Sequence, residues 1–110
     1  MVDVRFYVLQ RLTALVMAPL VLGHIAVMIY AVQGGLSAAE ILGRTQGSIG
    51  WFAFYGTFVV AVSVHAAIGL RTIIHEVFGL SGRPLSVTSW AICMLLLGMG
   101  GRAVIAVTLV

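Results

Sequence analysis

The sequence LTALVMAPLVLGHIAVMIYAV, which spans Leu12–Val32, decides the fold class because it contains no Asp, Glu, Lys or Arg. Two further apolar runs follow it, at Gly50–Leu70 and Thr88–Val110. A helix of about 20 apolar residues crosses a hydrocarbon core about 30 Å thick. The runs are continuous and do not alternate in polarity, which favours helices over barrel strands. The sequence therefore predicts an all-α integral membrane protein with three transmembrane helices.

The overall composition excludes an ordinary soluble domain. Hydrophobic residues make up 62% of the chain and charged residues only 8%, and the mean hydropathy is +1.18. Soluble domains contain about 25% charged residues. A soluble three-helix bundle would need charged outer faces, and this sequence cannot supply them.

We expect a single domain over residues 1–110, with helices at about residues 10–32, 50–77 and 88–110. The first ten residues are predicted to form an amphipathic lead-in near the membrane surface. Pro19 has no backbone N–H to donate, which predicts a kink in the first helix. A short helical turn is expected at Ser37–Leu42, inside the first loop.

The basic residues predict the orientation in the membrane. All six are arginines, and most flank the first helix or the second loop: Arg5, Arg11, Arg71 and Arg83. By the positive-inside rule, the N-terminus and the loop at residues 71–87 face the cytoplasm, and the C-terminus faces outside. A bacterial inner membrane is expected in preference to the mitochondrial one. The pI of about 9.8 then reflects topology, and no nucleic-acid partner is expected.

Two histidines lie within the apolar runs, where ionisable groups are functional candidates. His24 follows Arg11 by thirteen residues and His65 precedes Arg71 by six, which corresponds to rises of about 20 Å and about 9 Å. Because their levels differ, the two imidazoles are poorly placed to share a zinc or copper ion. Two haems stacked across the bilayer would need histidines at two levels. The alternative is that each histidine forms a packing contact between helices.

Small residues and one deep arginine accompany these histidines. Ala61 and Gly69 lie four residues before and after His65, where a flat macrocycle would need room, although close helix packing favours the same residue types. Arg102 lies deep in the third apolar run. Its guanidinium could pair with a haem propionate near His24, or its side chain could reach the outer surface by snorkelling.

Two segments resemble the membrane anchors of succinate:quinone oxidoreductases. Gln10-Arg11-Leu12-Thr13-Ala14, preceded by Tyr7, is similar to the family's Arg-x-Ser/Thr-Gly/Ala opening of the first helix, although the family often has His where Gln10 stands. His65-Ala66-Ala67-Ile68-Gly69-Leu70-Arg71, followed by Glu76, resembles the family's His-x-x-x-Gly-x-Arg motif with an acidic residue eleven positions after the histidine. Helix count, orientation and length extend the resemblance over most of the chain.

The resemblance implies specific roles. His65 would be an axial ligand of haem b, with Gly69 beside it. The implied quinone site, near an iron–sulfur subunit, comprises Arg11, Thr13, Tyr7 and Glu76, with Glu76 associated with proton supply. Electrons would pass from a flavoprotein subunit through iron–sulfur clusters to quinone, or in reverse in fumarate reductases. FAD and the clusters are expected only in partner subunits, and the chain alone is not expected to be catalytic.

The number of haems is left open by the sequence. Two-haem members of the family have a ligand histidine on the first helix as well as the second, and the 41-residue spacing from His24 to His65 resembles theirs. A second anchor chain would then supply the remaining axial ligands. Two other functions remain open: a haem-free structural anchor of a respiratory complex, and a small transport subunit in which His24, His65 and Arg102 form a proton or ion path.

Overall fold

The computed structural model describes residues 4–109, and this part of the chain is helical without any strand. The helices, in order, are α1 (Val4–Gly34), α2 (Ala38–Thr45), α3 (Ile49–Phe78) and α4 (Gly82–Thr108). Three of them, α1, α3 and α4, are long and apolar enough to cross a membrane. The predicted all-α protein with three membrane-spanning helices is confirmed.

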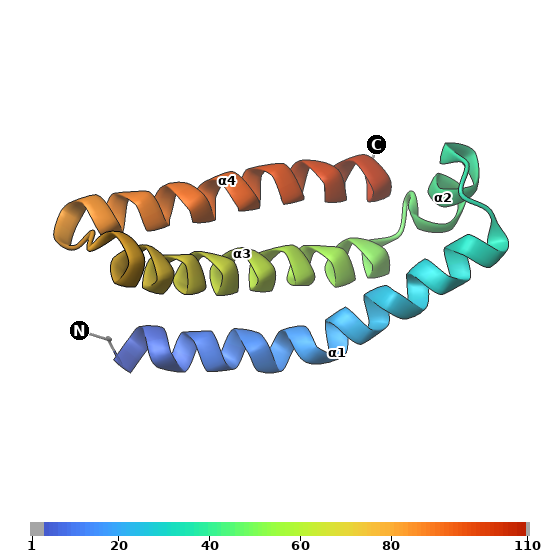
Figure 1. Cartoon of the computed structure of the whole chain (residues 1–110). Helices are drawn as coiled ribbons and strands as arrows, with labels where there is room; N and C mark the ends of the chain where they lie inside the picture. The colour runs from blue at the N-terminus through green and yellow to red at the C-terminus, as the bar shows by residue number, and fades with distance from the viewer. Residues whose placement is uncertain (1–3, 110) are drawn as a thin grey trace.

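The three long helices lie side by side, with α3 between α1 and α4 (Figure 1). The start of α1 and the α3–α4 turn lie at one end of the bundle, which we call the turn end. Helix α2 and the end of α4 lie at the other, which we call the α2 end (Figure 1). The molecule measures 48 × 24 × 23 Å. Its length therefore matches a bilayer of about 40–45 Å including the headgroups.

Helix α1 begins earlier than expected. It starts at Val4, so the predicted lead-in from residue 4 onward is part of the transmembrane helix, while residues 1–3 lie outside the described part. No Gly or Pro interrupts residues 4–10, so nothing in this segment prevents the helix from extending. Figure 1 shows a bend midway along α1, as expected from Pro19 in the middle of that helix.

The turn between α3 and α4 is shorter than expected. Helix α3 ends at Phe78 and is capped by Gly79, which adopts the left-handed conformation with φ 68° that glycine tolerates best. Helix α4 begins at Gly82 and not near Thr88. Pro84 lies in its first turn, where a missing N–H leaves no helical hydrogen bond unmade. The predicted end of this helix at Val110 lies outside the described residues.

Helix α2 contains the helical turn predicted at residues 37–42 and extends beyond it to Thr45. Ser37 caps its start, since the side-chain oxygen accepts a hydrogen bond from the backbone N–H of Glu40 at 3.2 Å. At the other end, Thr45 Oγ1 donates to the carbonyl of Val107 at 2.7 Å, and the N–H of Gly47 donates to the carbonyl of Thr108 at 2.6 Å. These bonds hold α2 against the end of α4.

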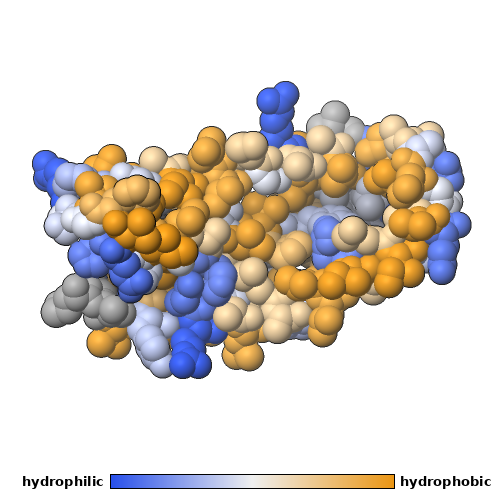
Figure 2. All heavy atoms as spheres, in the orientation of Figure 1, coloured by the Kyte–Doolittle hydropathy of each residue, from blue (hydrophilic) through white to orange (hydrophobic). Residues whose placement is uncertain are grey.

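Small residues dominate the interface that holds the bundle together. The buried side chains are Thr13, Thr45, Ala61, Ser63, Ala67, Leu85, Cys93, Val104 and Thr108. Large apolar side chains instead cover the outside, and Figure 2 shows them over the middle of the visible face, with hydrophilic residues mainly toward the ends and over the first part of α1. Such a surface suits lipid tails, and small residues between helices allow close backbone approach.

At Gly100, α4 packs tightly against Val59 of α3, which gives a direct prediction. A Cβ atom at Gly100 would stand 2.6 Å from Cγ1 of Val59. We expect Gly100→Ala to lower the free energy of unfolding in detergent or lipid by about 1–3 kcal/mol, the usual cost of overpacking. Gly98→Ala is the matched control, because nothing lies within 4 Å of a Cβ there. Equal stabilities of the two variants would contradict the close packing at Gly100.

Candidate functional site

A direct contact between α1 and α3 involves His65. Its Nδ1 atom lies 3.2 Å from Oγ1 of Thr13. Thr13 is buried, with 8% of its surface exposed, and His65 is half-buried. The spacing of 52 residues between them shows that this contact joins separate helices. The histidine of the His-x-x-x-Gly-x-Arg segment is thus held on the face of α3 that meets α1.

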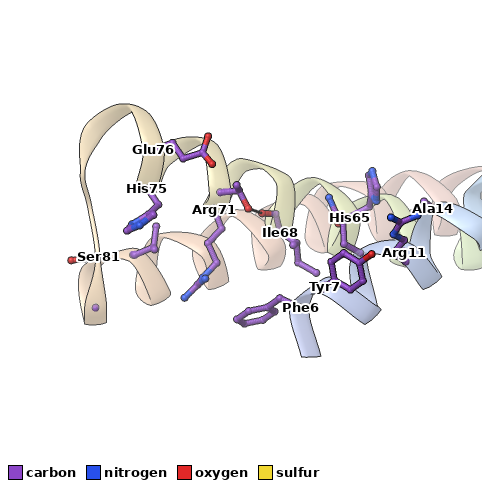
Figure 3. Close-up of a pocket in the computed structure, with 14 residues that line it drawn as sticks. Phe6, Tyr7, Arg11, Ala14, His65, Ile68, Arg71, His75, Glu76 and Ser81 are labelled. Atoms are coloured by element: carbon purple, nitrogen blue, oxygen red, sulfur yellow. Dashed lines mark hydrogen bonds between the residues drawn. The ribbon is translucent and has the colours of Figure 1, made fainter. Parts of the chain in front are cut away.

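His65 lines a pocket at the turn end. The pocket has a volume of about 470 Å³. It is lined by residues of α1, α3 and the start of α4: Phe6, Tyr7, Gln10, Arg11, Ala14, His65, Ile68, Arg71, Thr72, His75, Glu76, Ser81, Gly82 and Leu85. In Figure 3, Tyr7 and Arg11 lie near His65, and Arg71, His75 and Glu76 follow along α3 toward the turn. The pocket therefore extends from the α1–α3 contact to the end of the bundle.

Two arginines give this pocket a positive character. The guanidinium of Arg11 lies 5.2 Å from the ring centre of Tyr7, and that of Arg71 lies 4.7 Å from the ring centre of Phe6. Both distances fall within the range of cation–π interactions, which hold a guanidinium in place. Glu76 supplies the single carboxylate of the lining. The pocket therefore suits a ligand with carbonyl or carboxylate oxygens.

The side chain of Gln10, which lines this pocket, contains an unpaired acceptor. Its Oε1 atom is buried and has no hydrogen-bond partner among the described residues. A buried polar atom without a partner is costly and needs an explanation. A Cβ at Gly69 would stand 3.5 Å from Nε2 of Gln10, so the glycine lies directly beside this amide. The predicted cofactor residue Gly69 therefore packs against Gln10 and does not itself line the pocket.

The structure brings together most of the residues that the sequence placed at the turn end. Tyr7, Arg11, His65 and Glu76 line the same pocket. Thr13 was grouped with the quinone-site residues through the family resemblance, but it does not line this pocket, and its hydroxyl contacts His65 instead. The sequence did not predict Thr13 as a partner of the histidine.

The other histidine of the apolar runs, His24, is on α1 and packs against aromatic side chains of α3. Its ring centre is 5.2 Å from that of Phe58 and 6.1 Å from that of Tyr55, the latter in an edge-to-face arrangement with planes at 81°. These distances fall within the range of favourable aromatic contacts. Trp51 stacks on Tyr55 with ring centres 5.6 Å apart. His24 is therefore a packing residue in this structure, whether or not it also binds a ligand.

Arg102 does not meet His24 within this chain. Gly100 faces Val59 of α3, and Arg102, two positions further along, is rotated by about 200° around the helix. Its side chain is exposed. His24 packs against α3, whereas Arg102 leaves α4 on the side away from α3. The pairing of Arg102 with a propionate of a haem bound by His24 stays a prediction.

Most of the lining residues were not predicted as site residues, among them the polar or aromatic side chains of Phe6, Gln10, Arg71 and His75. A helical periodicity was present in the sequence, because Ile68, Arg71, Thr72 and His75 follow the spacing of a single helix face. Phe6 and Gln10 are likewise four residues apart. The missing information was that the start of α1 stays helical and packs against this face.

Three long apolar helices, with a partly polar pocket at one end of the bundle, define a multi-pass membrane protein. A family model described as succinate dehydrogenase/fumarate reductase transmembrane subunit matches residues 2–106. The chain belongs to this family, as its two motifs suggested. Comparisons with curated proteins and with solved structures gave no match.

The ring contacts of His24 lead to a prediction about stability. His24→Phe keeps a ring against Tyr55 and Phe58, and we expect its free energy of unfolding to stay within about 1 kcal/mol of wild type. His24→Ala removes the ring, and we expect a loss of about 1–3 kcal/mol. Unfolding of the lipid-reconstituted variants measures both values. An alanine variant as stable as wild type would show that these contacts do not stabilise the fold.

Proposed function

We propose that this chain is the haem b-binding anchor subunit of a succinate:quinone oxidoreductase or quinol:fumarate reductase. In this role it would connect the iron–sulfur subunit with membrane quinone. The observation that supports this best is the pocket at the turn end, in which His65, Arg11, Tyr7 and Glu76 come together. Family membership gives the class of complex, and the residues of the pocket support the proposed chemistry.

The residues around His65 fit a haem. His65 has its Nδ1 turned toward Thr13. Its Nε2 would bind the iron, and His65 would be the axial ligand. Arg71 offers a planar guanidinium that suits a propionate. Gly69 lies beside Gln10, since a Cβ there would stand at an ordinary contact distance of 3.5 Å from Gln10 Nε2. Haem b, when bound, would supply a one-electron carrier.

Quinone binding would use residues near the start of α1. Arg11 and Tyr7 are exposed and can donate hydrogen bonds to the carbonyl oxygens of a quinone head group. Reduction of a quinone to a quinol takes two electrons and two protons. Glu76 is exposed and lies toward the turn in the same pocket, where a carboxylate can pass protons from the aqueous side.

The partners and location follow from the same proposal. An iron–sulfur subunit and an FAD-containing flavoprotein would dock at the turn end, and a second anchor chain would supply the other axial ligand. Four of the arginines lie near the turn end: Arg5, Arg11, Arg71 and Arg83. With these arginines on the cytoplasmic side, the protein would lie in a bacterial inner membrane with its C-terminus outside.

The two alternative functions have less support. A transport path through His24, His65 and Arg102 would need these residues along one route, but Arg102 leaves α4 away from α3, and both histidines pack between α1 and α3. A haem-free anchor would not need the orphan acceptor of Gln10 or the two guanidiniums in one pocket.

A second haem at His24 remains a separate prediction. The aromatic contacts of His24 give it a packing role that needs no ligand. His24→Phe distinguishes the two functions, because it keeps a ring and removes the ligand nitrogen. Pyridine haemochrome stoichiometry that falls from two to one would support the second haem, and one haem in both proteins would exclude it.

The first functional prediction concerns haem binding. We expect His65→Ala to abolish the haem b absorbance of the purified complex, because the variant lacks the ligand nitrogen at the α1–α3 contact. His75→Ala is the control, since His75 lines the same pocket while its Nδ1 bonds to the carbonyl of Leu80 at 2.8 Å. Full absorbance in His65→Ala would exclude this assignment.

The second functional prediction separates quinone chemistry from haem binding. We expect Arg11→Ala and Glu76→Gln to lower the rate of quinone reduction about 10-fold or more, as for other lost catalytic donors and acids, while haem content stays near wild type. Thr72→Val is the control, because Thr72 lines the pocket but its hydroxyl donates to the carbonyl of Ile68 on its own helix. Parallel loss of haem and activity would instead indicate misassembly.

A further inference from the structure

We propose that Thr13 is a positioning residue for His65, which selects the tautomer that leaves Nε2 free to bind iron. This inference rests on the proposed function and gives Thr13 a role different from the quinone contact that the family resemblance implied. It is based on the hydrogen bonds of a single buried hydroxyl group.

The surroundings of the Thr13 hydroxyl define its direction of donation. Oγ1 lies 2.8 Å from the carbonyl oxygen of Leu9 and 3.0 Å from that of Gln10, and 3.2 Å from Nδ1 of His65. A hydroxyl has one proton, and carbonyl oxygens can only accept. The shorter contacts therefore take the proton, and the lone pair of Oγ1 is left to accept a hydrogen bond from Nδ1–H.

The consequence for His65 follows from the chemistry of neutral imidazole. When Nδ1 carries the proton, Nε2 has a free lone pair, which is the form that binds a metal. An acceptor at Nδ1–H also fixes the ring orientation and raises the basicity of the ligand nitrogen. Because Thr13 is on α1 and His65 on α3, this arrangement depends on correct packing of the two helices.

Thr13→Val and Thr13→Ser separate the hydroxyl from the shape of the side chain. Valine keeps the branched shape and removes the acceptor, whereas serine keeps the acceptor. Thr108→Val is the matched control, because Thr108 is fully buried and its hydroxyl donates to the carbonyl of Val104 at 2.6 Å without a histidine nearby. The whole complex is used, and each variant is measured by haem retention against a haem-scavenging protein and by potentiometric titration.

In Thr13→Val we expect haem affinity to fall about 10- to 100-fold, as with other lost outer-shell partners of metal ligands. The midpoint potential should rise, since a less basic imidazole stabilises the oxidised iron less. The KM for quinone should not change, because Thr13 does not line the pocket. Thr13→Ser and Thr108→Val should both resemble wild type.

Several outcomes would overturn the inference. A Thr13→Val complex with wild-type haem retention and midpoint potential would do so while leaving the proposed function intact. A raised KM for quinone at an unchanged potential would return Thr13 to the quinone site. If Thr13→Val does not assemble, Thr13→Cys replaces it, since a thiol is a weaker acceptor: a raised potential supports the inference and a wild-type potential contradicts it. Absence of haem from the wild-type complex would overturn the proposed function and this inference together.

Discussion

Polar side chains inside a bilayer must find their partners within the protein, and this constraint acts most strongly where α1 crosses α3. The Thr13–His65 contact, at 3.2 Å, lies at this crossing. No water in the hydrocarbon core could replace either partner. The pocket at the turn end depends on this contact, because the contact fixes which face of α1 meets α3. Tyr7 and Arg11 are thereby directed toward Arg71 and the turn. Small residues such as Ala61 and Ala67 allow the helices to come this close.

The two ends of the bundle differ in chemistry. At the turn end, two guanidiniums and a carboxylate line an open volume next to a histidine. At the α2 end, the histidine is packed among aromatic rings, and hydrogen bonds from α2 close the structure against α4. The two histidines of the membrane spans therefore have different surroundings. His65 lies beside cations and an open volume, whereas His24 lies against aromatic rings.

Much of this organisation could be predicted from the sequence. The helix count, the continuation of α3 past Leu70 and the meeting of Arg11, His65 and Glu76 follow from hydropathy, arginine distribution and two motifs. The start of α3 was predicted within one residue, but the starts of α1 and α4 were missed, because apolar content defines the membrane-embedded part and not the polar turns that extend it. The pairing of Thr13 with His65 was missed as well, since helical periodicity gives the face of each helix but not its rotation against a neighbour.

The central claim is that the turn end holds a haem b linked to succinate and quinone chemistry. The most direct measurement is a reduced-minus-oxidised optical spectrum of the intact wild-type complex, with succinate as reductant and quinone as oxidant. The account predicts a sharp α-band that appears on addition of succinate and disappears on addition of quinone. A purified, active complex without any α-band would contradict it and would make this chain a haem-free anchor.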